Sequence, residues 1–201
     1  MTAHALKIIL ASGLIAVAGS LASCASPPEP AQKQAQTKEG YKTYDQGTVS
    51  DEAERFLGGA SAGLADVLNR VFSDQGDPQA YIAGEEASAA IGVGLRYGKG
   101  HLYQPGKAPV KVFWSGPSVG FDAGANASKV FTLIYNLNST DAIFRRYPGV
   151  DGSYYVVGGV GTNYQQNGRT ILAPIRTGVG VRAGVNVGYL HYTRRYSVVP
   201  F

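Results

Sequence analysis

The chain has 201 residues but only one cysteine, one methionine and one tryptophan. The single cysteine, Cys24, excludes a disulfide bond within the chain. The sequence has no His-Glu-x-x-His motif and no second cysteine that could act as a nucleophile. His101 and His191 have no carboxylate close to them in the sequence. We therefore expect a protein without enzymatic activity, without a metal and without a cofactor.

Charge is also scarce, and it is unevenly distributed. The chain has 18 Lys and Arg against 14 Asp and Glu, a net charge of +4, which is too small to predict binding to nucleic acid. Residues 169–201, however, contain five arginines, one histidine and no carboxylate. Such a segment can attract anionic lipid headgroups or glycans, although a solvated basic surface without a specific partner is the alternative. The candidate contacts are Arg176, Arg182, Arg194 and Arg195, with Tyr189, Tyr192 and Tyr196 between them.

The N-terminus has the layout of a secretory signal peptide. Lys7 provides a positive charge, Ile8–Ala18 is an apolar stretch of about eleven residues, and small residues follow from Gly19 to Ala25. The apolar stretch is shorter than the roughly twenty residues of a transmembrane helix. We expect residues 1–23 to direct export and then to be removed.

The end of this signal fits a lipobox, in which an aliphatic residue and two small residues precede a cysteine. Leu21-Ala22-Ser23-Cys24 predicts a lipoprotein whose membrane anchor is attached to Cys24. Ordinary cleavage after Ala25 is the alternative, but an unpaired cysteine in an oxidising compartment is otherwise a liability. We expect the protein on the periplasmic side of the envelope, anchored in the inner leaflet of the outer membrane. Without lipidation, it is expected in the soluble periplasm.

Two segments precede the main domain. Residues 24–48 have almost no large apolar side chains and predict a disordered tether. Residues 49–78 predict an α-helical segment, because apolar residues recur at three- and four-residue intervals after Ser50, the expected N-cap. Gly58, Gly59 and Gly63 interrupt it, which indicates either a close packing contact or a break between two short helices.

Residues 79–201 predict a β domain, since the chain has 27 glycines and 13 tyrosines, and glycine is poor in helices whereas tyrosine favours strands. One short helix is expected at 139–146, and Pro148-Gly149 and Asn167-Gly168 predict turns. The regular spacing of the strands indicates an antiparallel barrel or sandwich. The candidate strands are 80–86, 89–97, 99–104, 109–115, 118–126, 129–136, 153–159, 160–167, 170–177, 178–188 and 189–195.

An internal near-repeat places glycines at alternate positions of two predicted strands. A regular row of glycines in a strand indicates sharp coiling or the close approach of a backbone, an aromatic ring such as Tyr189, Tyr192 or Phe121, or a ligand. Asp122 and Arg182 hold equivalent places in the two copies and are expected either to pair with each other or, for Arg182, to face an anion. The glycines of the two rows are Gly120, Gly124, Gly178, Gly180, Gly184 and Gly188.

Four longer segments resemble a known family. They are 113–131, 147–152, 157–165 and 172–190, and they look like the alphaproteobacterial envelope-integrity protein A family, over about residues 50–201. The resemblance implies a periplasmic protein that maintains the cell envelope and has no assigned enzymatic activity. It also implies a small closed antiparallel β-barrel of about ten short strands, preceded by one α-helix, and similar to the SYLF lipid-binding fold.

Together these features predict a non-enzymatic envelope protein that binds lipid or another anionic envelope component through a basic face of the barrel. The expected partners are the membrane, an anionic lipid or glycan, and other envelope proteins. Two alternatives are a purely structural scaffold between envelope proteins and a small outer-membrane barrel, although the Arg194-Arg195 pair and Pro200 do not suit a lipid-facing last strand.

Overall fold

The structure is a computed structural model that describes residues 42–59, 61–120, 126–177 and 188–197. Several predicted features lie outside these residues: Cys24 and most of the tether, Asp122, Arg182, Gly124, Gly178, Gly180, Gly184 and all but the last residue of the predicted strand 178–188. The elements are α1 (Gln46–Leu57), α2 (Ala62–Gln75), β1 (Ala80–Tyr103), β2 (Val110–Gly120), β3 (Asn126–Tyr135), the 3₁₀ helix η1 (Thr140–Ile143), β4 (Arg146–Pro148), β5 (Tyr155–Val157), β6 (Val160–Thr162), β7 (Gln165–Asn167), β8 (Thr170–Thr177) and β9 (Tyr189–Thr193).

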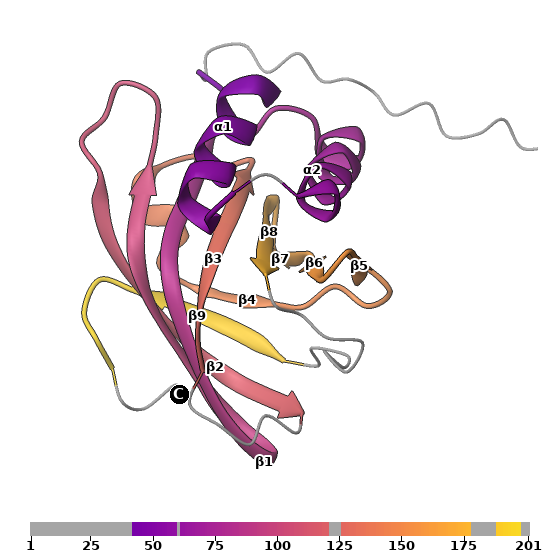
Figure 1. Ribbon diagram of the computed structural model, residues 1–201. Helices are drawn as coiled ribbons and strands as arrows, with labels where there is room; N and C mark the ends of the chain where they lie inside the picture. Colours follow the sequence, from indigo (N-terminus) through magenta and orange to yellow (C-terminus); the bar gives the residue numbers. More distant parts are fainter. Residues whose placement is uncertain (1–41, 60, 121–125, 178–187, 198–201) are drawn as a thin grey trace, which may run out of the picture. The chain divides into compact units, whose positions relative to one another are not determined.

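Two helices, not one, precede the sheet (Figure 1). The expected N-cap at Ser50 is wrong, because the Asp45 carboxylate accepts hydrogen bonds from both Thr48 N, at 2.9 Å, and Thr48 Oγ1, at 2.7 Å, and starts α1 earlier. The helix therefore begins at Gln46, inside the segment predicted as tether. It ends at Gly58, whose φ of 103° suits glycine. Both alternatives for the glycines are confirmed: the chain breaks at Gly58 and Gly59, and Gly63 makes a close packing contact, since a Cβ there would lie 2.4 Å from Val157 O.

The second helix starts at its own cap, since Ser61 Oγ accepts a hydrogen bond from Leu64 N at 3.1 Å. Neither described helix is long and apolar enough to cross a membrane. The short helix predicted over 139–146 is the 3₁₀ helix η1, which starts after Ser139 but receives no side-chain cap from it.

The longest strand, β1, doubles back on itself. Residues 84 and 100 would lie about 50 Å apart in a straight strand. A Cβ placed on Gly84 would nevertheless lie 2.9 Å from Gly100 Cα, and one on Gly100 would lie 2.7 Å from Gly84 Cα. The first arm, Ala80–Ser88, pairs with β3, and the second arm, Gly92–Leu102, pairs with β2. The two arms thus lie side by side.

The strands form one antiparallel sheet in the order β4-β9-β2-β1-β3-β8-β6-β5, with β7 also paired to β8. Figure 1 shows that this sheet is curled. The predicted strand at 170–177 matches β8, and the predicted turn at Asn167-Gly168 precedes it, with Gly168 at a φ of 57°. The mainly β, antiparallel prediction is confirmed, but the expectation of only short strands is wrong, because β1 and β2 have 24 and 11 residues.

Closure of the sheet into a barrel stays a prediction. Within the described residues, the two ends of the strand order do not pair with each other. An isolated bridge between Gly149 and Gln165 links the chain after β4 to β7, and Asn167 Nδ2 donates a hydrogen bond to Arg146 O at 2.7 Å.

Each face of the sheet carries its own hydrophobic cluster. Facing the helices are side chains such as Tyr81, Phe131 and Ile175, which pack with the apolar residues of α1 and α2. The inner face of the curl buries a second cluster, which includes Ile82, Trp114, Val130, Tyr147 and Tyr192. Because alternate residues of a strand point to opposite faces, the alternation along β1, β3 and β8 assigns each position to one cluster.

Candidate functional sites: a buried charge cluster and an exposed basic face

The inner face of the sheet contains a carboxylate among apolar residues. Ala80, Ile82 and Gly84 precede Glu86 at two-residue intervals on the first arm of β1, and all are buried. Glu86 therefore points into the curl, with 4% of its surface exposed, whereas the adjacent Glu85 points outward and is exposed. As expected from strand geometry, the two acidic residues do not form a dyad.

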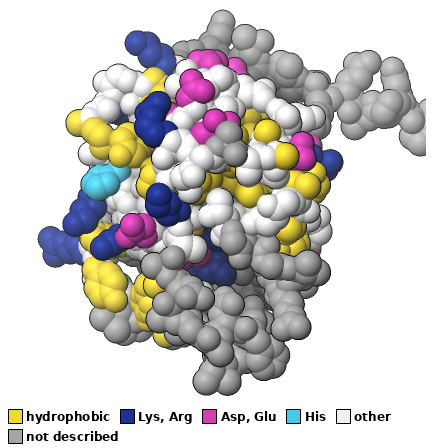
Figure 2. All heavy atoms as spheres, in the orientation of Figure 1, with side chains coloured by type: hydrophobic (Ala, Val, Ile, Leu, Met, Phe, Trp, Pro, Cys, Tyr) yellow, Lys and Arg dark blue, Asp and Glu magenta, His cyan; other side chains and the backbone are white. Residues whose placement is uncertain are grey.

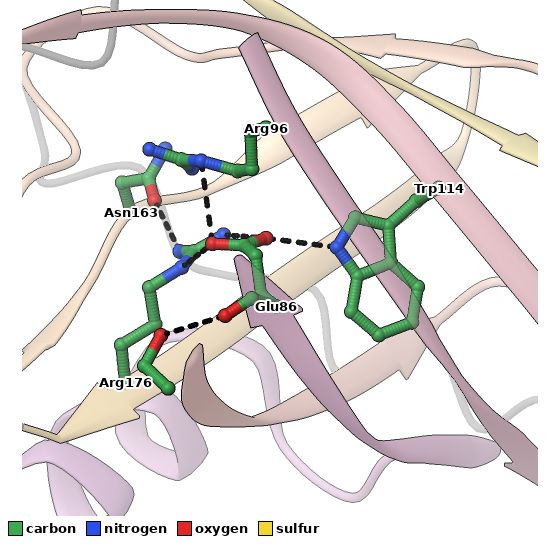
Figure 3. Close-up of polar contacts among 6 residues, drawn as sticks. Glu86, Arg96, Trp114, Asn163 and Arg176 are labelled. Carbon is green, nitrogen blue, oxygen red and sulfur yellow. Dashed lines mark hydrogen bonds and ion pairs between the residues drawn. The ribbon is translucent and has the colours of Figure 1, made fainter. Parts of the chain in front are cut away.

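Two arginines form ion pairs with this buried carboxylate (Figure 3). Arg96 Nε, from the second arm of β1, lies 3.2 Å from Glu86 Oε1, and Arg176 Nε, from β8, lies 3.1 Å from the same oxygen. The side chains of Arg96 and Arg176 are each only 11% exposed. Arg176 Nη1 also donates a hydrogen bond to Asn163 Oδ1 at 3.3 Å. We call these residues, together with Trp114, the buried charge cluster.

Trp114 reaches Glu86 from β2 by crossing the second arm of β1. Its indole Nε1 donates a hydrogen bond to Glu86 Oε2 at 2.8 Å. Gly98 lies directly opposite Trp114 in the register, and a Cβ on Gly98 would come within 1.9 Å of the indole. Only glycine at this position lets the ring pass. An aromatic ring across glycines was the predicted kind of contact, but it occurs at Gly84 and Gly98, outside the predicted rows.

Burial by itself raises the pKa of Glu86, but the charges of Arg176 and Arg96 outweigh it, and the pKa is lowered below its ordinary value. The carboxylate is thus held ionised. Burial raises the pKa of the neighbouring Tyr192, and it raises that of Tyr147 to about 12. Both phenols therefore remain protonated at neutral pH.

The outer face of the second arm of β1, β2, β9 and β4 is different in character. These strands contain no Asp or Glu, and their outward positions hold the exposed Lys99, Lys111 and Arg146. Aromatic rings lie beneath two of these cations: Lys111 Nζ is 5.2 Å from the Phe113 ring centre and Arg146 Cζ is 5.3 Å from that of Tyr189. We call the three cations and the two rings the basic face, which thus consists of Lys99, Lys111, Arg146, Phe113 and Tyr189. Figure 2 shows Lys and Arg side chains gathered with a histidine and hydrophobic groups on the left of the view.

The arginines predicted to bind an anion lie in different environments. Arg176 belongs to the buried charge cluster and does not reach the surface as a contact. Arg194 is exposed, pairs with Asp141 and lies over the Phe144 ring at 4.3 Å. Arg195 is exposed. Of the predicted glycines that are described, Gly120 pairs with Gly92 at the end of β2, and Gly188 packs against Pro117, whose Cγ would lie 3.2 Å from an added Cβ.

Residues 116–120 match a sequence pattern found around the nucleophilic serine of some hydrolases. Gly116-Pro117-Ser118-Val119-Gly120 matches Gly-x-Ser-x-Gly, the pattern of a hydrolase nucleophile elbow, which requires a sharp turn from a strand into a helix. In this structure the whole pattern lies within β2, where Ser118 pairs with Gly94 of β1. The backbone is extended there, so the pattern is not an elbow.

Comparison with known proteins identifies relatives of this chain. The family described as envelope integrity protein A matches residues 42–201. Among solved structures, the chain is similar to a beta-barrel-like, uncharacterized protein from Brucella abortus, with 44% sequence identity and a TM-score of 0.72. The match covers 79% of this chain and 99% of that one. No curated protein matches the chain.

Proposed function

The chain belongs to the envelope integrity protein A family, and we propose that it supports the cell envelope as a non-enzymatic protein that binds anionic lipid through its basic face. The observation that carries this proposal is the outward row of Lys99, Lys111 and Arg146 on strands without any acidic residue. Each Lys or Arg held near an anionic membrane surface contributes about 1 kcal/mol of attraction.

The aromatic side chains of this face support a lipid surface as the partner. Phe113 and Tyr189 lie under the cations, and Tyr196 beside them is 61% exposed. Amphipathic aromatic rings favour the headgroup region of a membrane, where one edge is wet and the other is apolar. The basic face thus combines charge attraction with interfacial anchoring, but its cations are not the C-terminal arginines that were predicted for this role.

The proposal includes an anchor and a location. Export by residues 1–23 and lipidation at Cys24 would hold the domain close to a membrane on the periplasmic side, with the following residues as a tether. We also propose that the sheet closes into a barrel through β7 and the chain after β4. The bridge between Gly149 and Gln165 and the hydrogen bond from Val150 N to Tyr164 O, at 2.8 Å, support this closure.

The buried charge cluster supports a non-enzymatic role. Its carboxylate is paired with two guanidinium groups and an indole, and the nearby phenols are held protonated. A general acid or base needs a pKa close to the working pH and access to a substrate. Glu86, which is buried and ionised, has neither.

The test is sedimentation of the purified protein with vesicles that contain phosphatidylglycerol. Lys111→Glu with Arg146→Glu reverses two charges of the basic face, and we expect binding at least tenfold weaker, since about 1.4 kcal/mol corresponds to a factor of ten. Wild-type binding should weaken as salt is raised to 0.5 M, because exposed charges are screened beyond roughly 10 Å already at 0.1 M.

The matched control is Lys42→Glu with Arg55→Glu, which changes the net charge equally at the helices. Both residues are exposed there, and Arg55 has a side-chain exposure of 68%. This control should bind as the wild type does. If both double variants bind equally well, or if the wild type does not sediment with anionic vesicles, the lipid proposal fails. Loss of envelope resistance in cells without loss of vesicle binding would favour a protein scaffold instead.

A further inference from the structure

A small hollow lies at the edge of the basic face. It has a volume of about 270 Å³ and is lined by Glu85, Tyr97, Lys99 and Tyr196, with Glu86, Ala87 and Gly98 also contributing to its wall. Pockets for drug-sized ligands have volumes of roughly 300–1,000 Å³, so this hollow suits a small group such as a headgroup. On the opposite side of the sheet, the Glu86 carboxylate belongs to the buried charge cluster, and the Trp114 indole passes over Gly98.

Two tyrosine rings form the aromatic part of the hollow. The ring centres of Tyr97 and Tyr196 lie 6.2 Å apart, with their planes tilted by 40°. Phe113 holds the outer ring by an edge contact, with its ring centre 6.2 Å from that of Tyr196. The faces of aromatic rings attract cations, and cages of such rings recognise quaternary ammonium groups. The hollow thus offers a cation an aromatic surface.

A carboxylate and an ammonium group stand at the rim. Glu85 and Lys99 are on the two adjacent arms of β1, where a Cβ on Gly84 would lie 2.4 Å from Lys99 O. Both side chains are exposed. Within the part of the chain that the structure describes, Glu85 and Lys99 do not form an ion pair with each other, although they line the same hollow. Lys129 lies opposite Glu85 in the register with β3, but its Nζ donates a hydrogen bond to Phe56 O at 2.9 Å. The opposite charges of Glu85 and Lys99 match a ligand that carries both signs.

We propose that this hollow binds the zwitterionic headgroup of a phospholipid, with the ammonium group against the exposed faces of Tyr97 and Tyr196 near Glu85 and the phosphate on Lys99. This proposal rests on the proposed function, because it gives the lipid-binding face a site for one class of lipid. An anionic ligand would use only Lys99, and a cationic one would use only Glu85 and the aromatic rings. A zwitterion satisfies both.

The experiment uses the purified protein with phosphatidylcholine vesicles at 0.5 M salt, where attraction to the basic face is screened. We expect sedimentation with these vesicles but not with vesicles of an uncharged glycolipid, and we expect soluble phosphocholine to compete. Tyr196→Ala should weaken binding about tenfold, whereas Tyr196→Phe, which keeps the ring, should bind like the wild type. Glu85→Gln and Lys99→Gln should each weaken it several-fold.

The controls are Asp66→Asn on α2 and Lys42→Gln before α1, which make the same charge changes at exposed positions on the helix side. Both should bind like the wild type. The proposal is overturned if phosphocholine does not compete, or if Glu85→Gln and Tyr196→Ala bind as tightly as the controls. Because every substituted side chain is at least partly exposed, unfolding midpoints should stay at the wild-type value and confirm that each variant is folded.

One variant separates this proposal from the broader one. Glu85→Gln removes a negative charge beside the basic face, so it should bind phosphatidylglycerol vesicles at low salt at least as well as the wild type. The same variant should bind phosphatidylcholine less well. If the basic face binds anionic vesicles but Glu85→Gln leaves phosphatidylcholine binding unchanged, only the headgroup site is wrong. Failure of anionic binding as well would overturn the proposed function itself.

Discussion

Glu85 and Glu86 are neighbours in β1, yet they lie in opposite environments. Glu86 is 4% exposed and is held by two arginines and an indole, whereas Glu85 is exposed on the outer face. The inner side of the sheet cannot leave a charge without partners, because an unpaired buried charge is very costly. The outer side can leave Glu85 and Lys99 available for a ligand, because water solvates them. One strand therefore carries a structural carboxylate on one side and a candidate binding carboxylate on the other.

Of the substitutions that test this contrast between Glu85 and Glu86, Glu86→Gln should lower the free energy of unfolding most. It would leave the guanidinium groups of Arg96 and Arg176 buried without their counter-charge, so we expect a loss of about 3–5 kcal/mol in the free energy of unfolding. Urea denaturation with a fluorescence readout from Trp114 measures it. A loss no greater than that of Glu85→Gln would show that the buried charge cluster does not depend on its carboxylate.

Trp114→Phe should have a smaller effect. It keeps a ring over Gly98 but removes the Nε1–H that donates to Glu86. A hydrogen bond to a charged group contributes about 1.5–3 kcal/mol, and we expect a loss of this size in the free energy of unfolding. Circular dichroism during denaturation is the suitable measurement, since the variant has no tryptophan. Unchanged stability would mean that Arg96 and Arg176 satisfy the Glu86 carboxylate without the indole.

Acid should weaken the same cluster by protonating it. The folded-state pKa of Glu86 lies below its ordinary value of 4.5, so its stabilising contribution is fully present above pH 4.5 and is lost as the pH falls through the folded-state pKa. Thermal unfolding midpoints from pH 6 down to pH 3 follow this loss. Glu86→Gln should show a shallower decline than the wild type, and parallel curves would contradict the assignment.

The smallest expected effects on stability belong to the outer face. Glu85→Gln and Lys99→Gln should change the free energy of unfolding by no more than about 0.5 kcal/mol, as is usual for exposed residues. Urea denaturation of these two variants, measured in parallel with Glu86→Gln, checks this prediction. A loss above about 2 kcal/mol in either variant would mean that these side chains stabilise the sheet, and the contrast between the two sides of β1 would disappear.

Local features of the sequence predicted much of the fold. Strand β8 was placed correctly because Asn167-Gly168 fixes the turn before it, and the break after α1 was among the alternatives because Gly58 and Gly59 interrupt the helix. The family was also recognised from the sequence, since its motifs are long and specific, and this is confirmed. The early start of α1 was missed because Asp45 lies within a polar segment that gives no apolar pattern.

The candidate sites were harder to predict. The sequence could not tell Glu86 from Glu85 as the buried carboxylate, because Tyr81 and Ala83 make the other side of the strand apolar as well. The partners of Glu86 could not be predicted either, since Arg96 lies beyond the bend of β1 and Trp114 and Arg176 come from other strands. Arg176 was predicted to face a ligand from its place in a basic segment, but the register with β3 turns it into the curl.

The sequence by itself determined the antiparallel β class, the family, the candidate lipobox at Cys24 and the basic character of the C-terminal part. These depend on composition, periodicity and motifs that are local in the chain. Only the tertiary structure decided which charges are paired inside and which are exposed. The doubling back of β1 brings Glu86 to Arg96 and Glu85 to Lys99, and the curl brings Arg176 to the same carboxylate. Contacts between distant residues depend on strand register, which a single sequence does not specify.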